Sequence, residues 1–263
     1  MRVITLNCNG IRSAARKGLF DWLARQKADY LCLQETKAQP ADLEALPEKE
    51  RELFFPKGWH AHFNSAVKKG YSGVAVYCRE KPDAVLDKLG AAEFDDEGRY
   101  LEVRHGNLSV VSLYAPSGSA GPERQASKDR FLAVFLPHLA EWSRSGRDYV
   151  ICGDWNIAHR NVDLKNWKGN QKNSGFLPHE RAWLDEVFKE GVWVDGYRHL
   201  HPATEGESYT WWSNRGAAWA KNVGWRIDYQ VVSGKLRARL KRAAIFKDNR
   251  FSDHAPLTMD YAE

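Results

Sequence analysis

Short runs of apolar residues recur along the whole chain, and their length is that of β-strands. Val, Ile, Leu and Tyr fill most of these runs without alternating with polar residues, which is typical of strands covered on both faces. The expected strands span residues 3–6, 30–33, 73–77, 108–113, 149–152, 229–232 and 257–259. A helical spacing of apolar residues appears instead at 14–26, 128–143 and 180–190. Strands and helices mixed in this way predict a layered α/β architecture.

Polar or ionisable side chains stand where several of these strands begin or end. They are Asn7, Glu35, Tyr114, Asp154, Asn156, Asp228, Asp253 and His254. Taken singly, most have a structural explanation, because Asn and Asp form turns and acidic residues cap helices. Their shared position at strand ends favours a common site. If the ends converge, the carboxylates need a cation to offset their mutual repulsion.

The donor types in this set indicate which cation would bind. Carboxylate and amide oxygens without thiolates favour a hard divalent ion, Mg²⁺ or Mn²⁺. Glu35 is the first choice as ligand, because it is the only acid in its segment beside Gln34 and Lys37. Mg²⁺ takes only one or two protein carboxylates and keeps waters, so its open shell suits a phosphate substrate.

His254 and its neighbours would supply the remaining catalytic chemistry. A histidine that acts as general base or charged stabiliser works best beside a carboxylate that orients its ring, and Asp228 is the candidate. Asp154 is expected to position the attacking water. Tyr114 and Asn156 are expected to donate hydrogen bonds to phosphoryl oxygens.

The composition bounds the class of protein without identifying a substrate. The chain has 263 residues, a net charge of +5 and 43% hydrophobic residues. It is therefore not disordered, and no apolar run has the roughly 18 residues of a membrane span. We expect one catalytic domain over residues 1–263 and no contact with a membrane. The 11 tryptophans and the basic charge suggest nucleic acid or sugar as a partner, although a well-packed core and a solubilising charge also explain them.

The four cysteines, Cys8, Cys32, Cys78 and Cys152, lie in apolar runs and form no C-x-x-C pair. Cysteines in such positions act as small hydrophobic core residues, so we expect them to be buried and reduced. Neither a zinc site nor a disulfide framework is expected. Together with an N-terminus too short and polar for a signal peptide, this predicts a cytoplasmic protein.

Seven ordered sequence blocks resemble one known family. The blocks are Asn7-Cys-Asn-Gly-Ile-Arg, Leu33-Gln-Glu-Thr-Lys, Tyr71-Ser-Gly-Val-Ala, Leu113-Tyr-Ala-Pro-Ser-Gly, Gly153-Asp-Trp-Asn-Ile-Ala, Gly224-Trp-Arg-Ile-Asp-Tyr and Ser252-Asp-His-Ala-Pro. They are similar to the exodeoxyribonuclease III family of apurinic/apyrimidinic endonucleases. The resemblance extends from the first residue to beyond Pro256 with the blocks in order, so it is highly specific.

This resemblance implies a four-layer α/β sandwich of two packed mixed sheets flanked by helices. It also implies Mg²⁺-dependent hydrolysis of the phosphodiester on the 5′ side of an abasic site in duplex DNA. Members differ in how much 3′→5′ exonuclease and 3′-end-cleaning activity accompanies this reaction. We expect a monomer whose partner is double-stranded DNA containing an abasic site.

The resemblance also implies roles by matching position. Glu35 would be the main metal ligand, with Asn7 and Asp253 nearby in the metal region. The matched catalytic residues are Asp154, which orients or deprotonates the water, Asn156, which assists it, the phosphate-contacting Tyr114, and the pair Asp228–His254. One departure is Asn9, where some relatives have Asp, so a second tight metal site is not expected here.

Further residues are matched to DNA contacts. The block Gly169-Asn-x-x-Asn-x-Gly-Phe resembles the family's phosphate-binding loop and favours Asn170 and Asn173. Gly70 and Tyr71 resemble a backbone contact, with Lys37 and Arg99 as weaker candidates. Trp211, Trp225 and Ile227 would line an apolar pocket for the flipped abasic sugar, and an intact nucleotide would be excluded by size. Ordinary surface-loop and core positions are the alternative explanation.

Two other kinds of function remain open at this point. The first is a non-specific DNase or a phosphatase of the same superfamily, which shares the Glu and Asp-His strand ends. The second is an inactive DNA-binding scaffold on this fold, which loss of Glu35, Asp154 or His254 would indicate; all three are present. The arginine that some animal relatives insert into the duplex is replaced by Ser117-Gly-Ser-Ala-Gly, so that insertion is not expected here.

Overall fold

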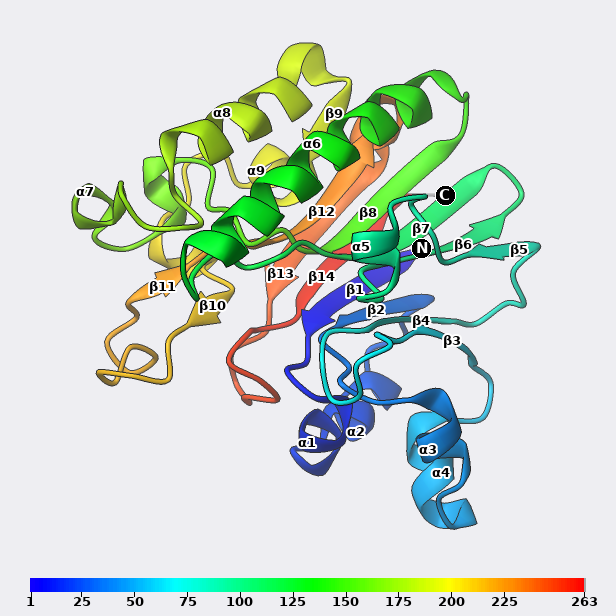
Figure 1. Cartoon of the computed structure of the whole chain (residues 1–263). Coiled ribbons are helices and arrows are strands. Elements are labelled where there is room, and N and C mark those ends of the chain that lie inside the picture. The colour runs from blue at the N-terminus through cyan, green and yellow to red at the C-terminus, as the bar shows by residue number, and fades with distance from the viewer. Residues whose placement is uncertain (263) are drawn as a thin grey trace.

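The computed structural model describes residues 1–262 and consists of two large β-sheets packed face to face (Figure 1). One six-stranded sheet has the order β13 (Leu240–Ile245), β14 (Leu257–Tyr261), β1 (Arg2–Asn7), β2 (Tyr30–Gln34), β4 (Val74–Cys78) and β3 (His60–Asn64). The other has the order β5 (Ala84–Leu86), β6 (Tyr100–His105), β7 (Leu108–Tyr114), β8 (Asp148–Asp154), β12 (Asp228–Ser233) and β9 (Trp193–Asp195). A separate ribbon pairs β10 (Trp211–Trp212) with β11 (Gly224–Trp225). All seven strands expected from the sequence are confirmed.

Each large sheet contains a parallel pair of neighbouring strands. β1 runs parallel to β2, and β7 runs parallel to β8, whereas neighbours such as β1–β14 and β8–β12 are antiparallel. The sheets are therefore mixed, as the resemblance implied. Because parallel strands end at the same edge of a sheet, these pairs place Asn7 beside Gln34 and Tyr114 beside Asp154.

Helices cover the outer face of each sheet and complete the four layers (Figure 1). The sheet of β1 is covered by α1 (Ile11–Arg16), α2 (Leu19–Ala24), α3 (Pro40–Glu44) and α4 (Glu48–Phe54). The sheet of β8 is covered by α6 (Pro122–Arg144) and α8 (Pro178–Val187), with the short α5 (Ala92–Asp95) beside them. Two further short helices are α7 (Trp167–Asn170) and α9 (Gly196–Leu200). The four-layer sandwich is confirmed.

The expected helices differ from the observed ones at their ends. The helix expected at 14–26 is two helices, because Gly18 between α1 and α2 has a left-handed φ of +86°. The helix expected at 128–143 begins earlier, at Pro122, whose fixed φ suits a first helical turn. The helix expected at 180–190 ends at Val187, and the chain then turns through Glu190, whose φ is +57°.

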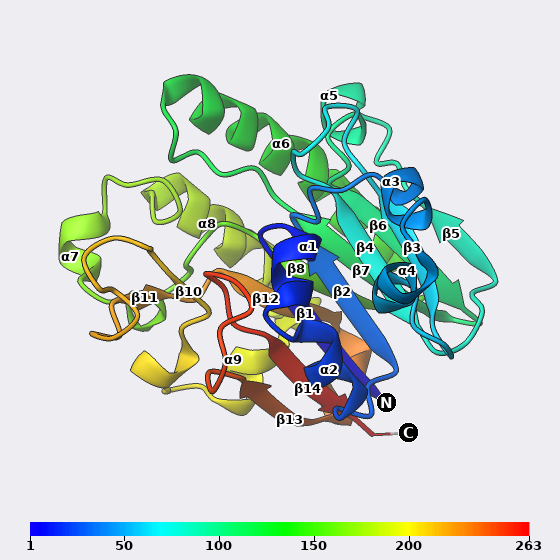
Figure 2. The ribbon, with the colours of Figure 1, turned by 90° about the horizontal axis from the view of Figure 1, so that it is seen from below.

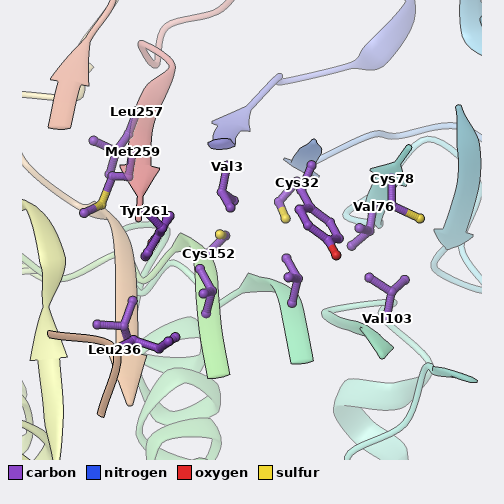
Figure 3. Packing of buried hydrophobic residues seen from close by; sticks show 14 of the residues in the cluster. Val3, Cys32, Val76, Cys78, Val103, Cys152, Leu236, Leu257, Met259 and Tyr261 are labelled. Atoms are coloured by element: carbon purple, nitrogen blue, oxygen red, sulfur yellow. The ribbon is translucent and has the colours of Figure 1, made fainter. Parts of the chain in front are cut away.

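Apolar side chains from both sheets fill the space between them (Figure 3). Val3, Cys32 and Val76 from one sheet pack in the same cluster as Val103 and Cys152 from the other. Full burial of a valine is worth about 1.5–3 kcal/mol, so this layer holds the two sheets firmly together. All four cysteines are buried and free, as the sequence predicted.

The first and last strands lie side by side, as both views of the ribbon show (Figure 2). β1 and β14 are antiparallel neighbours, and the backbone N–H of Tyr261 donates to the carbonyl of Met1 at 2.8 Å. Asn7 therefore lies at the opposite end of β1 from these residues. Among residues 1–262, none of the helices combines the length and the apolar character that crossing a membrane requires.

A cluster of four buried charged residues joins distant segments of the chain. Asp163 accepts hydrogen bonds from Arg226 at 2.8 Å and from Arg198, and Asp195 accepts from Arg226 at 2.7 Å. Burial would raise the pKa of Asp163, but the two guanidinium groups hold it well below its usual range. The cluster therefore ties α9 and the loop of Asp163 to the segment between β11 and β12 that carries Arg226.

Candidate active site

Strand register brings the expected catalytic side chains together at one end of the sandwich. Tyr114 is the register partner of Asp154 in the parallel pair β7–β8. Asp228 is the partner of Asp154 in the antiparallel pair β8–β12. From the other sheet, Nδ2 of Asn7 donates to Oδ2 of Asp154 at 2.9 Å. The convergence of strand ends that the sequence predicted is therefore confirmed.

Asn7 connects two carboxylates from inside this cluster. Its Nδ2 also donates to Oε1 of Glu35 at 2.8 Å, and its Oδ1 accepts the backbone N–H of Asn9. The sequence placed Asn7 in the metal region. Its amide nitrogen thus contacts the carboxylates of both Glu35 and Asp154, while its amide oxygen keeps a second lone pair available.

Glu35 and Lys37 form an ion pair beside Asn7, with Nζ of Lys37 2.9 Å from Oε2 of Glu35. Burial would raise the pKa of Glu35, but the Asn7 hydrogen bond and the charge of Lys37 outweigh it, so the pKa is lowered. Both residues have unusual positive φ angles, +49° for Glu35 and +50° for Lys37. Backbone conformations of this kind cluster at functional sites, where they aim a side chain.

His254 lies between two buried carboxylates. Its Nδ1 is 2.9 Å from Oδ2 of Asp228, and its Nε2 is 3.8 Å from Oδ2 of Asp154. Burial opposes protonation of the imidazole, but the two carboxylates outweigh it, so the pKa of His254 is raised. Burial also raises the pKa of Asp154, opposed by His254 and assisted by Asp228. The pairing of Asp228 with His254 is the one that the sequence predicted.

The turn after β8 holds Asp154 with its own backbone. The N–H of Asn156 donates to Oδ1 of Asp154 at 2.9 Å, and the Asn156 carboxamide lies 3.3 Å from Oδ2. The same carboxamide donates to the carbonyl of Ala115 at 2.8 Å. Asn156 has a left-handed φ of +54°, which lets its backbone and its side chain face the same carboxylate.

Tyr114 and Arg99 form a stacked pair at the end of β7. The guanidinium carbon of Arg99 lies 4.8 Å from the ring centre of Tyr114, and the group donates to the Tyr114 carbonyl at 3.0 Å. It also donates to the hydroxyl of Tyr71 at 3.0 Å. The side chain of Arg99 is only 1% exposed, so the predicted contact between Arg99 and DNA needs correction. Arg99 supports the rings of Tyr114 and Tyr71 from inside the protein.

A pocket of about 500 Å³ opens over this cluster. The catalytic and metal candidates that line it are Glu35, Tyr114, Asp154, Asn156, Asp253 and His254. The predicted apolar residues Trp211, Trp225 and Ile227 also line it, and the two indole rings meet edge to face at 6.4 Å. The remaining lining residues besides Asn173 were not among the predicted site residues; they are Ser117, Gly118, Ser119, Gly121, Lys172, Ser174 and Gly175. All except Lys172 are Gly or Ser, whose small side chains carry no chemical signal of their own.

The other predicted DNA contacts lie around this pocket or beyond it. Asn173 lines the pocket and donates from Nδ2 to Oδ1 of Asn170 at 2.8 Å. Gly70 is exposed with φ of +73°, and the hydroxyl of the following Tyr71 donates to Glu97 at 3.1 Å. Contacts between these residues and DNA stay predictions.

The donor set of the pocket fits a hard divalent cation. Glu35, Asp154 and Asp253 present carboxylates to it, and none of its lining residues among 1–262 is a cysteine. Oδ1 of Asp228 is buried and has no hydrogen-bond partner among the described residues. Oxygen donors without thiolates are the ligands that Mg²⁺ and Mn²⁺ prefer. All three carboxylates are already held by neighbours: Asp253 by Asn9, Glu35 by Asn7, and Asp154 by Asn7 and Asn156.

Comparison with known proteins now identifies the family. Residues 4–254 match the model of the endonuclease/exonuclease/phosphatase family. The chain belongs to this family. The endonuclease/exonuclease/phosphatase family is metal-dependent, in agreement with the acidic pocket. A curated relative, the exodeoxyribonuclease of Bacillus subtilis (strain 168), is 38% identical over 260 residues, with 98% of each chain covered.

Solved structures of other members share the whole fold. An AP endonuclease from Archaeoglobus fulgidus superposes with a TM-score of 0.86 at 27% identity, covering 99% of each chain. A 3′–5′ exonuclease from Neisseria meningitidis gives the same TM-score of 0.86 at 26% identity, covering 100% of each chain. One family fold therefore carries both activities.

Proposed function

We propose that this protein is a metal-dependent DNA repair nuclease that hydrolyses the phosphodiester on the 5′ side of an abasic site in duplex DNA. The observation that carries the proposal is a pocket in which the carboxylates around Asp154 meet the indole rings of Trp211 and Trp225. An acidic cluster alone suits many phosphoester substrates. An apolar wall beside it fits a sugar that has flipped out of the duplex and lacks its base. The names of the exodeoxyribonuclease and AP endonuclease relatives support the same substrate class.

The proposed cofactor is Mg²⁺, with Mn²⁺ as an alternative, held by Glu35 with Asp253 nearby. When bound, the cation orients the phosphate and offsets charge on its oxygens. Asn7 keeps the Glu35 carboxylate aimed into the pocket through its 2.8 Å hydrogen bond.

Asp154 is proposed to orient and deprotonate the attacking water. The backbone of Asn156 holds one of its oxygens and the side chain of Asn7 holds the other, so the carboxylate is fixed before substrate arrives. A buried carboxylate with a raised pKa is also a better proton acceptor than an ordinary aspartate.

His254 and Tyr114 are proposed to stabilise the phosphoryl oxygens. The raised pKa of His254 beside Asp228 favours the charged imidazolium, which is suited to stabilising negative charge rather than to accepting a proton. Burial, reinforced by the charge of Glu35, raises the pKa of Tyr114 well above its usual range, so the phenol stays neutral and able to donate.

Removal of the metal should abolish the reaction. A duplex with a single tetrahydrofuran abasic analogue is incubated with the protein and Mg²⁺, and the products are separated by length. We expect one incision 5′ to the analogue, none with EDTA, and recovery when Mg²⁺ is added in excess. Incision that persists in EDTA would contradict a metal-dependent mechanism.

Replacing Trp225 with alanine should weaken discrimination between abasic and intact DNA. The variant removes part of the apolar side of the pocket, and truncation of a well-packed aromatic residue at a binding interface can cost about 2 kcal/mol or more. We expect affinity for the tetrahydrofuran duplex, measured in EDTA by fluorescence anisotropy, to fall by about tenfold or more, with little change for the intact duplex. Trp59→Ala, at a partly buried tryptophan that does not line the pocket, is the matched control. Equal losses on both duplexes would indicate a packing role for Trp225.

The same site could act on 3′ ends, as the 3′–5′ exonuclease relative indicates by its title. We include 3′→5′ exonuclease and 3′-end-cleaning activity in the proposed range. Time courses on an abasic duplex, a recessed 3′ end and a 3′-phosphate end rank the three activities. A non-specific DNase would cut the intact duplex as fast as the abasic one, and a scaffold would bind without cutting either.

A further inference from the structure

A lysine and a glutamate form an ion pair inside the protein, outside the catalytic cluster. Nζ of Lys128 on α6 lies 2.6 Å from Oε1 of Glu180 on α8, and both side chains are 0% exposed. Two charges buried in this way lose their solvation, so the pair contributes little net stability relative to apolar side chains. The other contacts of the two residues therefore indicate what the pair does.

Lys128 holds the turn that carries the catalytic aspartate. Its Nζ donates to the backbone carbonyl of Asn156 at 2.8 Å. This contact fixes the peptide plane after Asn156, the residue whose left-handed φ lets its N–H and its carboxamide face Asp154. The contact therefore holds the backbone on the C-terminal side of Asn156, next to the two groups of Asn156 that face Asp154.

Glu180 holds the loop that forms one wall of the pocket. Its Oε2 accepts the backbone N–H groups of Gly175 at 2.7 Å and Leu177 at 3.0 Å. Gly175 and the two residues before it line the pocket. A Cβ on Gly175 would lie 3.0 Å from the Asn156 carbonyl oxygen and 3.3 Å from the ring of Trp225, so the loop, the turn and the apolar wall are in direct contact here.

We propose that Lys128 and Glu180 are positioning residues whose ion pair sets the spacing between the Asp154–Asn156 turn and the loop of residues 172–175. In the proposed function the turn prepares the attacking water, and the loop lines the pocket and lies in the block matched to phosphate binding. The inference therefore rests on the proposed nuclease function. The pair would then set the position of the attacking water relative to the scissile phosphate. Loss of the pair should therefore lower kcat and leave the affinity for duplex DNA unchanged.

The test compares variants of Lys128 on the tetrahydrofuran duplex with saturating Mg²⁺. Lys128→Met keeps the length of the side chain and removes its charge and donors. We expect kcat to fall by about 10²-fold, the effect of a misplacement of about 1 Å, with unchanged affinity for intact duplex in EDTA. Lys128→Arg can still donate to the carbonyl and to the carboxylate, so it should restore most of kcat.

Two further variants separate positioning from general loss of stability. Glu102→Gln alters the ion pair between a buried carboxylate and the partly exposed Arg104. Glu102 does not line the pocket, so this variant should keep the wild-type kcat. The double variant Lys128→Met/Glu180→Gln leaves neither charge buried without a partner. It should therefore fold even if Lys128→Met alone does not, and it should still show the loss of kcat. All are assayed below the onset of thermal unfolding, followed by circular dichroism.

The outcomes are distinct. Wild-type kcat in folded Lys128→Met or in the folded double variant, or an equal loss of kcat in Glu102→Gln, would overturn the positioning role. A wild-type protein that does not incise the abasic duplex would contradict the proposed function itself, and the inference with it. Loss of kcat in Lys128→Met with rescue by Lys128→Arg supports the inference.

Discussion

Replacing Asp154 with asparagine should lower kcat on an abasic duplex by about 10³-fold or more, within the range that a positioned general base contributes. The amide cannot accept a proton from water. In the wild type the carboxylate accepts hydrogen bonds from Nδ2 of Asn7 and from the backbone N–H of Asn156. The NH₂ group of the asparagine would face one of these two donors and could not accept its hydrogen bond. Single-turnover incision with saturating Mg²⁺ measures the chemical step directly.

Asp148→Asn, the same substitution at the opposite end of β8, is the matched control and should leave kcat unchanged. Binding of Mg²⁺ or Mn²⁺ to both variants by titration calorimetry shows whether the metal site survives. Near-normal incision by Asp154→Asn would remove Asp154 from the proposed mechanism. Loss of activity accompanied by loss of metal binding would make Asp154 a metal ligand instead of the residue that prepares the water.

Replacing Asp163 with alanine should lower the free energy of unfolding by about 3–5 kcal/mol, because it leaves the buried guanidinium groups of Arg226 and Arg198 without their shared partner. Asp185→Ala removes a carboxylate that is 74% exposed and paired with His159, so it should cost less than about 1 kcal/mol. Urea unfolding followed by circular dichroism at pH 7 gives both values. Equal costs for the two variants would contradict the role assigned to the buried cluster.

The difference in free energy of unfolding between the wild type and Asp163→Ala should depend on pH. The pKa of Asp163 is lower in the folded protein than in the unfolded chain, so its stabilising contribution is complete above the unfolded value and is lost as the pH falls toward the folded one. The difference between wild type and Asp163→Ala should therefore narrow by about 1 kcal/mol between pH 7 and pH 3. A difference that widens on acidification would mean that the carboxyl is protonated in the folded state.

The strands that the sequence revealed are those buried on both faces, such as β1 and β8, because an apolar run marks them directly. Several strands it did not reveal lie at sheet edges, such as β13, where Lys241 and Arg242 are exposed between buried neighbours. Another, β6, lies inside its sheet, but charged residues interrupt its apolar run. Edge strands carry charge because unpaired edges must avoid pairing with other chains. A search for apolar runs therefore passes over them.

The candidate site was predictable where chemistry and position coincide, as at Asp154 and His254, because ionisable groups recur at the ends of several strands. Arg99 was misjudged because its guanidinium looks the same in sequence whether it faces DNA or the underside of Tyr114. Lys128 gave no signal at all, since a lysine within an amphipathic helix ordinarily faces solvent. Only the packing of α6 against α8 and the loop shows that it is enclosed.

The site draws Asn7 from the first strand and His254 from just before the last, across two sheets that meet only when the interior between them has formed. During synthesis the earliest contributor leaves the ribosome long before the latest, and domains of this size fold as units. A nascent chain that ends before this last segment has Glu35, Asp154 and Asp228 but neither Asp253 nor the imidazole that faces Asp154 and Asp228. The complete cluster therefore requires translation through residue 254.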